Sequence, residues 1–208
     1  MTHIRHSEKV LFMRIVIAVL ILIFSLQSLT KAEDISEFEI EGMSIGDSLL
    51  DYTTKEDLKQ KSKADYPASK KFSRYTLRSI NFKIYDDVQF HFKTDDSKYI
   101  ISSISGGIYY KKNIKNCFKK KDEVVEEISN LFEDAKMKDK GTSPWLSADK
   151  SGNTKTTNVY FYLKSGAYIE IACYDWSKEI TEKKNWTDHL KIAVYTKEIR
   201  DWLNNEAF

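Results

Sequence analysis

The chain has 208 residues and a nearly balanced charge, with 33 basic and 31 acidic side chains and a net charge of +2 at neutral pH. This balance excludes the strongly basic character that nucleic-acid-binding proteins usually show, so no nucleic-acid partner is expected.

Residues 1–32 have the features of a secretory signal peptide. Basic residues precede an apolar run at 15–24, and small residues stand at Thr30 and Ala32, where a signal peptidase would read them. The run is shorter than the roughly 20 residues that span a bilayer, which favours cleavage after Ala32 over an uncleaved membrane anchor. No cysteine follows the run to carry a lipid. We therefore expect a periplasmic or secreted protein that meets a membrane only through this segment, if it stays uncleaved.

Removing residues 1–32 from the 208 leaves 176, enough for a sizeable core. The removed segment holds four basic residues and one acidic residue, so 29 basic and 30 acidic residues remain and the net charge becomes about −1. We expect a single domain at 33–208, with possible halves at 33–112 and 113–208.

Short helices and alternating strands are predicted in the first half. Ser44 followed by Asp47 is close to a capping box, and Thr53 followed by Glu56 is a second cap signal. Residues that alternate between apolar and polar indicate strands. A strand is predicted at 37–41, helices at 44–52 and 54–61, and strands at 75–84, 88–93 and 99–110.

An amphipathic helix is predicted at 116–135, near the middle of the chain. Its apolar residues step by three and four along one face, and its opposite face is charged. Cys117 lies on the apolar face, so this helix is expected to lie against a sheet with that cysteine buried.

The second half is expected to return to strands. Residues 137–158 are polar and predict a long loop, with Trp145 as an anchor. Strands are predicted at 159–164, 168–176 and 189–195, and a final helix at 197–203 capped by Thr196. The sequence therefore predicts an α+β fold with antiparallel meander sheets and helices packed on one face. Residues 88–93 resemble 159–164, which suggests two helix-then-hairpin repeats.

A disulfide is predicted between Cys117 and Cys173, the only two cysteines. An even number of cysteines in an exported protein favours pairing. Both side chains are expected to point into one core between helix and sheet, as a disulfide requires. Two free buried thiols are the alternative.

Two hydrolase motifs overlap near residue 44. Residues 42–46 fit the G-x-S-x-G pattern and residues 46–49 the G-D-S-L block, so Ser44 or Ser48 could act with His189 in a GDSL-like serine esterase. However, Asp188 directly precedes His189 where the block requires D-x-x-H, and a nucleophile elbow needs a parallel sheet. We favour a structural explanation, in which Ser44 caps a helix and Gly46 allows tight packing, and therefore a non-catalytic protein.

The sequence predicts no metal site and no cofactor. Its His, Cys and carboxylate residues show no ligand spacing. The lysine runs at 111–112 and 119–121 are interpreted as a solvent-exposed face at the start of the helix. The alternative is that these lysines contact an anionic lipid or polymer.

Five aromatic residues are expected to share one outward sheet face: Tyr160, Tyr162, Tyr168, Tyr174 and Trp176. Tyrosine and tryptophan are enriched at recognition surfaces because they combine apolar area with a polar tip. The alternative is that a second layer covers them, either the C-terminal helix with Trp202 or the loop with Trp145.

Several segments carry a resemblance. Residues 38–52, 88–92, 102–107, 173–177 and 185–189 resemble a family of small exported proteins of marine bacteria, and this resemblance implies export but no activity. A second resemblance concerns the order of elements, in which residues 42–44 precede a short helix and then a meander. This order is similar to that of the small outer-membrane-assembly lipoprotein domain and of the β-lactamase-inhibitor-protein-like fold. Those resemblances imply a binding module.

The sequence thus favours a non-catalytic binding or protein-interaction module whose partner is a protein or an envelope polymer. A GDSL-like esterase is one alternative, and a structural envelope protein is another.

Overall fold

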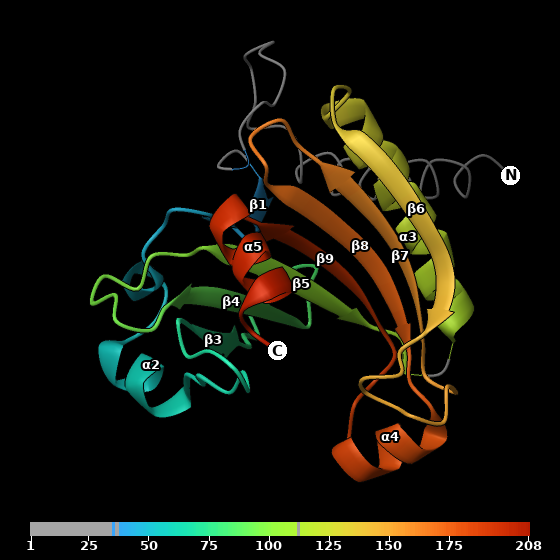
Figure 1. Ribbon diagram of the computed structural model, residues 1–208, viewed down its shortest axis with the longest axis horizontal. Coiled ribbons are helices and arrows are strands. Elements are labelled where there is room, and N and C mark those ends of the chain that lie inside the picture. Colours follow the sequence, from blue (N-terminus) through green and yellow to red (C-terminus); the bar gives the residue numbers. More distant parts are fainter. Residues whose placement is uncertain (1–34, 36–37, 112) are drawn as a thin grey trace, which may run out of the picture. The chain divides into compact units, whose positions relative to one another are not determined.

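The computed structural model describes residue 35 and residues 38–111 and 113–208. The predicted signal segment and its cleavage site lie outside the described residues. Within these residues the chain forms a seven-stranded antiparallel sheet, a two-stranded ribbon and four α-helices that pack against the sheet (Figure 1). The predicted α+β class is confirmed.

The N-terminal elements are short. β1 (Glu39–Ile40) and β2 (Met43–Ser44) form the ribbon, followed by a 3-10 turn, η2 (Leu49–Asp51), and by α2 (Lys55–Lys61). The prediction of α2 is confirmed, and Thr54 caps it by accepting a hydrogen bond from the Asp57 amide. The helix predicted at 44–52 is wrong: the Ser44 amide donates to Asp47 Oδ2 at 2.8 Å, which holds a turn there.

The large sheet consists of two meanders joined side by side. Its order is β3-β4-β5-β9-β8-β7-β6, and the meanders meet where β5 pairs with β9. The strands are β3 (Phe72–Leu77), β4 (Asp87–Lys93), β5 (Ser103–Tyr109), β6 (Lys136–Pro144), β7 (Lys155–Tyr162), β8 (Tyr168–Asp175) and β9 (His189–Tyr195). One continuous sheet therefore runs through both predicted halves.

Two predictions at the sheet are wrong. The strand predicted at 75–84 ends at Leu77, because the Glu41 carboxylate accepts hydrogen bonds from the amides of residues 83–85 and holds that segment as a loop, with Ile80 fully exposed. The loop predicted at 137–158 contains β6, which pairs with β7 and has a bulge between Asp139 and Gly141. Its side chains are all exposed, so it lacks the apolar alternation that marks a buried strand.

The helices occupy both faces of the sheet. α3 (Ile114–Leu131) packs on β8 and β9, and α2 packs on the same face beside β3. α5 (Lys197–Asn205) and α4 (Lys178–Lys184) contribute to apolar clusters on the opposite face. The predicted one-sided packing therefore describes α2 and α3, and the other two helices cover the second face. We call the face under α3 the inner face and the other the outer face.

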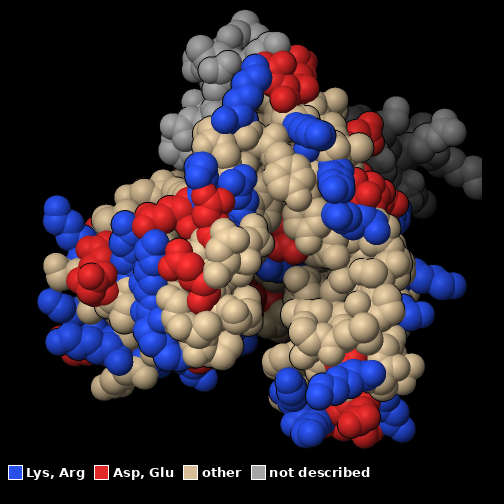
Figure 2. Space-filling model, in the orientation of Figure 1, with Lys and Arg blue, Asp and Glu red and all other residues tan. Residues whose placement is uncertain are grey.

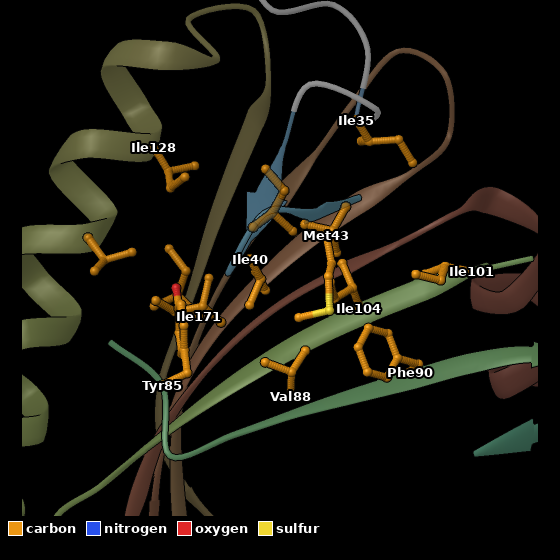
Figure 3. Packing of buried hydrophobic residues seen from close by; sticks show 14 of the residues in the cluster. Ile35, Ile40, Met43, Tyr85, Val88, Phe90, Ile101, Ile104, Ile128 and Ile171 are labelled. Carbon is orange, nitrogen blue, oxygen red and sulfur yellow. The ribbon is translucent and has the colours of Figure 1, made fainter. Parts of the chain in front are cut away.

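The main core fills the space between the inner face and α3 together with the β1–β2 ribbon. Figure 3 shows Ile128 of α3 above Ile171 of β8, with Ile40 and Met43 of the ribbon over the neighbouring strands β4 and β5. Ile40 and Ile171 are fully buried. This core holds the sheet on its inner face, while α4 and α5 cover parts of the outer face.

The predicted disulfide is present. Cys117 on α3 and Cys173 on β8 lie with their sulfur atoms 2.00 Å apart and are both buried. It ties the central helix to the middle of the sheet.

Removing the disulfide is expected to lower the free energy of unfolding by about 3 kcal/mol, because the unfolded chain loses a crosslink across 56 residues. Urea unfolding of the Cys117→Ser/Cys173→Ser variant would measure this loss. Dithiothreitol should destabilise the wild type and leave the variant unchanged. Equal stability of the reduced and oxidised wild type would contradict the prediction.

Candidate functional site

The strand register places four of the five predicted aromatics on the outer face. Tyr162 lies opposite Tyr168, and Tyr160 lies opposite Glu170, so these side chains of β7 and β8 point the same way. Tyr174 follows on the same face of β8, and Trp176 comes directly after that strand. The predicted set is brought together, but its members differ in exposure.

Tyr174 and Trp176 are covered. They are only 8% and 9% exposed, and the Trp145 ring lies 5.2 Å from each of their rings. Ile180 of α4 closes the same cluster, and Trp186 packs on Trp176 at 4.5 Å. For these two residues the alternative of a covering layer is therefore confirmed, and the loop with Trp145 supplies it.

Tyr160, Tyr162 and Tyr168 form a second group that stays half-exposed, which we call the tyrosine patch. Their three ring centroids are 6.0 to 6.2 Å apart. Tyr168 also stacks on the buried Tyr195 ring at 4.6 Å and 13°. Tyr195 in turn packs with α5, so the patch is held from beneath by a fixed ring.

An ion pair between the buried Glu170 and the half-buried Lys191 lies beside the tyrosine patch. Lys191 Nζ donates to Glu170 Oε2 at 2.9 Å, and Glu170 also accepts hydrogen bonds from the hydroxyls of Tyr195 at 3.2 Å and Tyr160 at 3.4 Å. Burial alone would lower the pKa of Lys191, but Glu170, Tyr174 and Tyr195 outweigh burial and raise this pKa well above its ordinary value. Lys191 therefore stays charged, and Glu170 orients the Tyr160 ring by accepting the hydrogen bond from its hydroxyl.

Small side chains in the middle of the outer face leave a shallow depression there. Between α5 and α4, the neighbouring strands place Ser105, Gly107, Ala172 and Ala193 on this face, around the ion pair. A side chain at Gly107 would come within 2.7 Å of Asp87 Oδ1. Figure 2 shows the resulting hollow in the middle of the face, with basic and acidic atoms at its floor.

Two lysines border the tyrosine patch on the side of the edge strand. Lys136 lies opposite Tyr162, and Lys138 lies opposite Tyr160, so both belong to the outer face. Both are exposed, and neither is among the ion pairs of the described residues. We call these two residues the lysine rim.

The residues of the esterase alternative are not brought together. The Ser48 hydroxyl donates to the Lys98 carbonyl at 2.7 Å, and the Ser44 hydroxyl faces the Phe38 carbonyl at 3.4 Å. His189 stacks on Tyr174 at 4.6 Å, and its Nδ1 lies 2.8 Å from the Thr187 carbonyl. In the described part of the chain, no hydrogen bond joins either serine to a histidine.

His91 is a buried, uncharged histidine. Its Nε2 lies 2.6 Å from the Tyr66 hydroxyl, and its Nδ1 lies 2.8 Å from Ser103 Oγ. Burial first, and then the positive charges of Lys191 and Arg74, lower the pKa of His91 to about 3. Nε2 thus holds the segment before β3 to the sheet, and Nδ1 joins β4 to β5 within it, which indicates a structural role.

Two further features are absent from the described residues. They contain no group of three or more His, Cys, Asp or Glu side chains placed to hold a metal ion. Nor does any described helix have the length and apolarity to cross a membrane.

Sequence reasoning missed Glu170, Lys191 and the lysine rim. Alternation along β8 and β9 does place Glu170 and Lys191 outward, but their pairing depends on a register that only the folded sheet defines. Lys136 and Lys138 were hidden inside the predicted loop. Comparison of the chain with protein-family models, with curated proteins and with solved structures gives no match, so the geometry of this face alone carries the functional inference.

Proposed function

We propose that this protein is a non-catalytic binding module, acting in the periplasm or outside the cell, that recognises its partner through the tyrosine patch. The observation that carries the proposal is the half-buried state of Tyr160, Tyr162 and Tyr168, whose rings lie together on the outer face, whereas Tyr174 and Trp176 on that face are covered.

Fixed tyrosines suit recognition for a physical reason. Each ring can bury a large apolar area on binding while its hydroxyl keeps a polar partner. Tyr168 is stacked on Tyr195, and Tyr160 is hydrogen-bonded to Glu170, so ordering these rings on binding costs little conformational entropy.

The compartment rests on two supports. The sequence predicts a signal peptide at 1–32, and the structure contains a disulfide, which forms and persists in oxidising compartments.

Replacing Tyr160 and Tyr162 together by alanine is expected to weaken partner capture at least tenfold, because anchor tyrosines at interfaces often contribute 2 kcal/mol or more. In-cell crosslinking, followed by pull-down of the full chain and mass spectrometry, would measure the loss. Urea unfolding of the variant should show that it is folded under the assay conditions.

The matched control is Ile80→Ser, which removes a fully exposed apolar side chain from the loop after β3. Partner capture should survive this change. Capture that is unaffected by the tyrosine double variant would refute the proposed surface.

A further inference from the structure

We propose that the tyrosine patch and the lysine rim together bind an acidic polysaccharide, a chain of sugar rings that carry carboxylates. This inference rests on the proposed binding function and adds the chemical class of the partner.

The charges at this surface favour an anion. Acidic side chains around the patch have basic partners: Glu170 pairs with Lys191, Asp134 before β6 pairs with Lys164 after β7, and Asp201 of α5 pairs with Lys197 and Arg200. The lysine rim has no such partner among the ion pairs of the described residues. The unneutralised charge beside the rings is therefore positive, and it is exposed enough to meet a carboxylate without a large desolvation cost.

The rings favour a saccharide chain. The face of a tyrosine ring is electron-rich and attracts the C–H bonds that line one side of a pyranose, while the tyrosine hydroxyl can bond to sugar hydroxyls. The three rings, whose centroids form a triangle with sides of 6.0 to 6.2 Å, offer one compact aromatic platform. An extended acidic peptide would turn every second side chain away from such a face.

The placement of the rim fits the same ligand. Lys136 and Lys138 lie directly across the strand pair from Tyr162 and Tyr160, so each of these tyrosines of β7 has one lysine as its cross-strand neighbour on the outer face. A sugar unit stacked on a ring would thus bring its carboxylate toward the lysine of the neighbouring strand. Figure 2 shows basic side chains along this edge of the outer face, with acidic side chains beside them.

The test uses polygalacturonate as the probe, with dextran as a neutral polysaccharide and poly-L-glutamate as an acidic polypeptide. The full chain is titrated with each polymer by calorimetry at low salt. We expect binding to polygalacturonate, at least tenfold weaker binding to the other two polymers, and a further loss at 0.5 M NaCl because exposed charges are screened.

Two variants identify the surface. Tyr160→Ala/Tyr162→Ala should abolish polygalacturonate binding, and Lys136→Gln/Lys138→Gln should weaken it about tenfold. The matched control is Lys55→Gln/Lys59→Gln, which removes two exposed lysines from α2 on the inner side of the sheet and should change nothing.

Several outcomes would overturn the inference. Equal binding of poly-L-glutamate would indicate a general polyanion or an acidic protein, and equal binding of dextran would remove the lysine rim from recognition. If polygalacturonate does not bind while the pull-down still captures a partner through the tyrosine patch, the binding function stands and the saccharide assignment fails.

Discussion

Replacing Lys191 by methionine is expected to lower the free energy of unfolding by about 4 kcal/mol, because it leaves the Glu170 carboxylate buried without its cation. Glu170 is 8% exposed and would retain only the two tyrosine hydroxyls as donors. Urea unfolding at pH 8 would measure the loss.

Removing both charges is expected to reverse most of this loss. In Glu170→Leu/Lys191→Met no buried charge remains, and such replacements are often neutral or stabilising. A double-mutant cycle therefore separates the coupling of the pair from the burial cost of each charge. If the double variant proved as unstable as Lys191→Met, the instability would come from packing and the electrostatic account would be wrong.

The same double variant also tests what the pair does for binding. A stable apolar replacement would show that the fold does not require the charges. Tyr160 would have lost the acceptor of its hydroxyl, so we expect partner capture to fall several-fold while stability is retained. That result would identify Glu170 and Lys191 as positioning residues for the tyrosine patch.

The elements that could be predicted from the sequence are those whose burial leaves a periodic signal. Apolar residues recur with helical spacing in α3 and at alternate positions in β4, β8 and β9, and they form the buried face of each element. The same periodicity placed the two cysteines in one core. β6 was missed because a fully exposed edge strand has no such period, and the loop after β3 was missed because its shape depends on the distant carboxylate of Glu41.

The candidate site was only half predictable for a related reason. Alternation placed the tyrosines of β7 and β8 on one face, but it could not show which of them a second layer covers. The covering layer consists of α4 and Trp145, which pack on Tyr174 and Trp176. On the other side, α5 belongs to the cluster against which Tyr168 packs. The lysine rim requires the pairing of β6 with β7, a contact that local pattern does not encode.

Acidification is expected to destabilise the protein through His91 before its carboxylates titrate. The pKa of His91 is about 3 in the folded protein and about 6.5 when unfolded, so below pH 6.5 only the unfolded chain takes up this proton. The contribution is fully present above pH 6.5 and is lost as the pH falls toward 3. The total is about 5 kcal/mol, of which about 3 kcal/mol falls between pH 6.5 and 4.5.

The variant His91→Gln isolates this contribution, because an amide can still bond to Tyr66 and Ser103 but does not titrate. Urea unfolding at pH 7 and pH 4.5 should show a much smaller difference for this variant than for the wild type. His189→Gln is the matched comparison: burial lowers the pKa of His189 as well, in the same direction, but this ring is only partly buried and should contribute less. If His91→Gln kept the full wild-type pH dependence, the prediction would be wrong. The loss of stability at low pH would then come from groups other than His91.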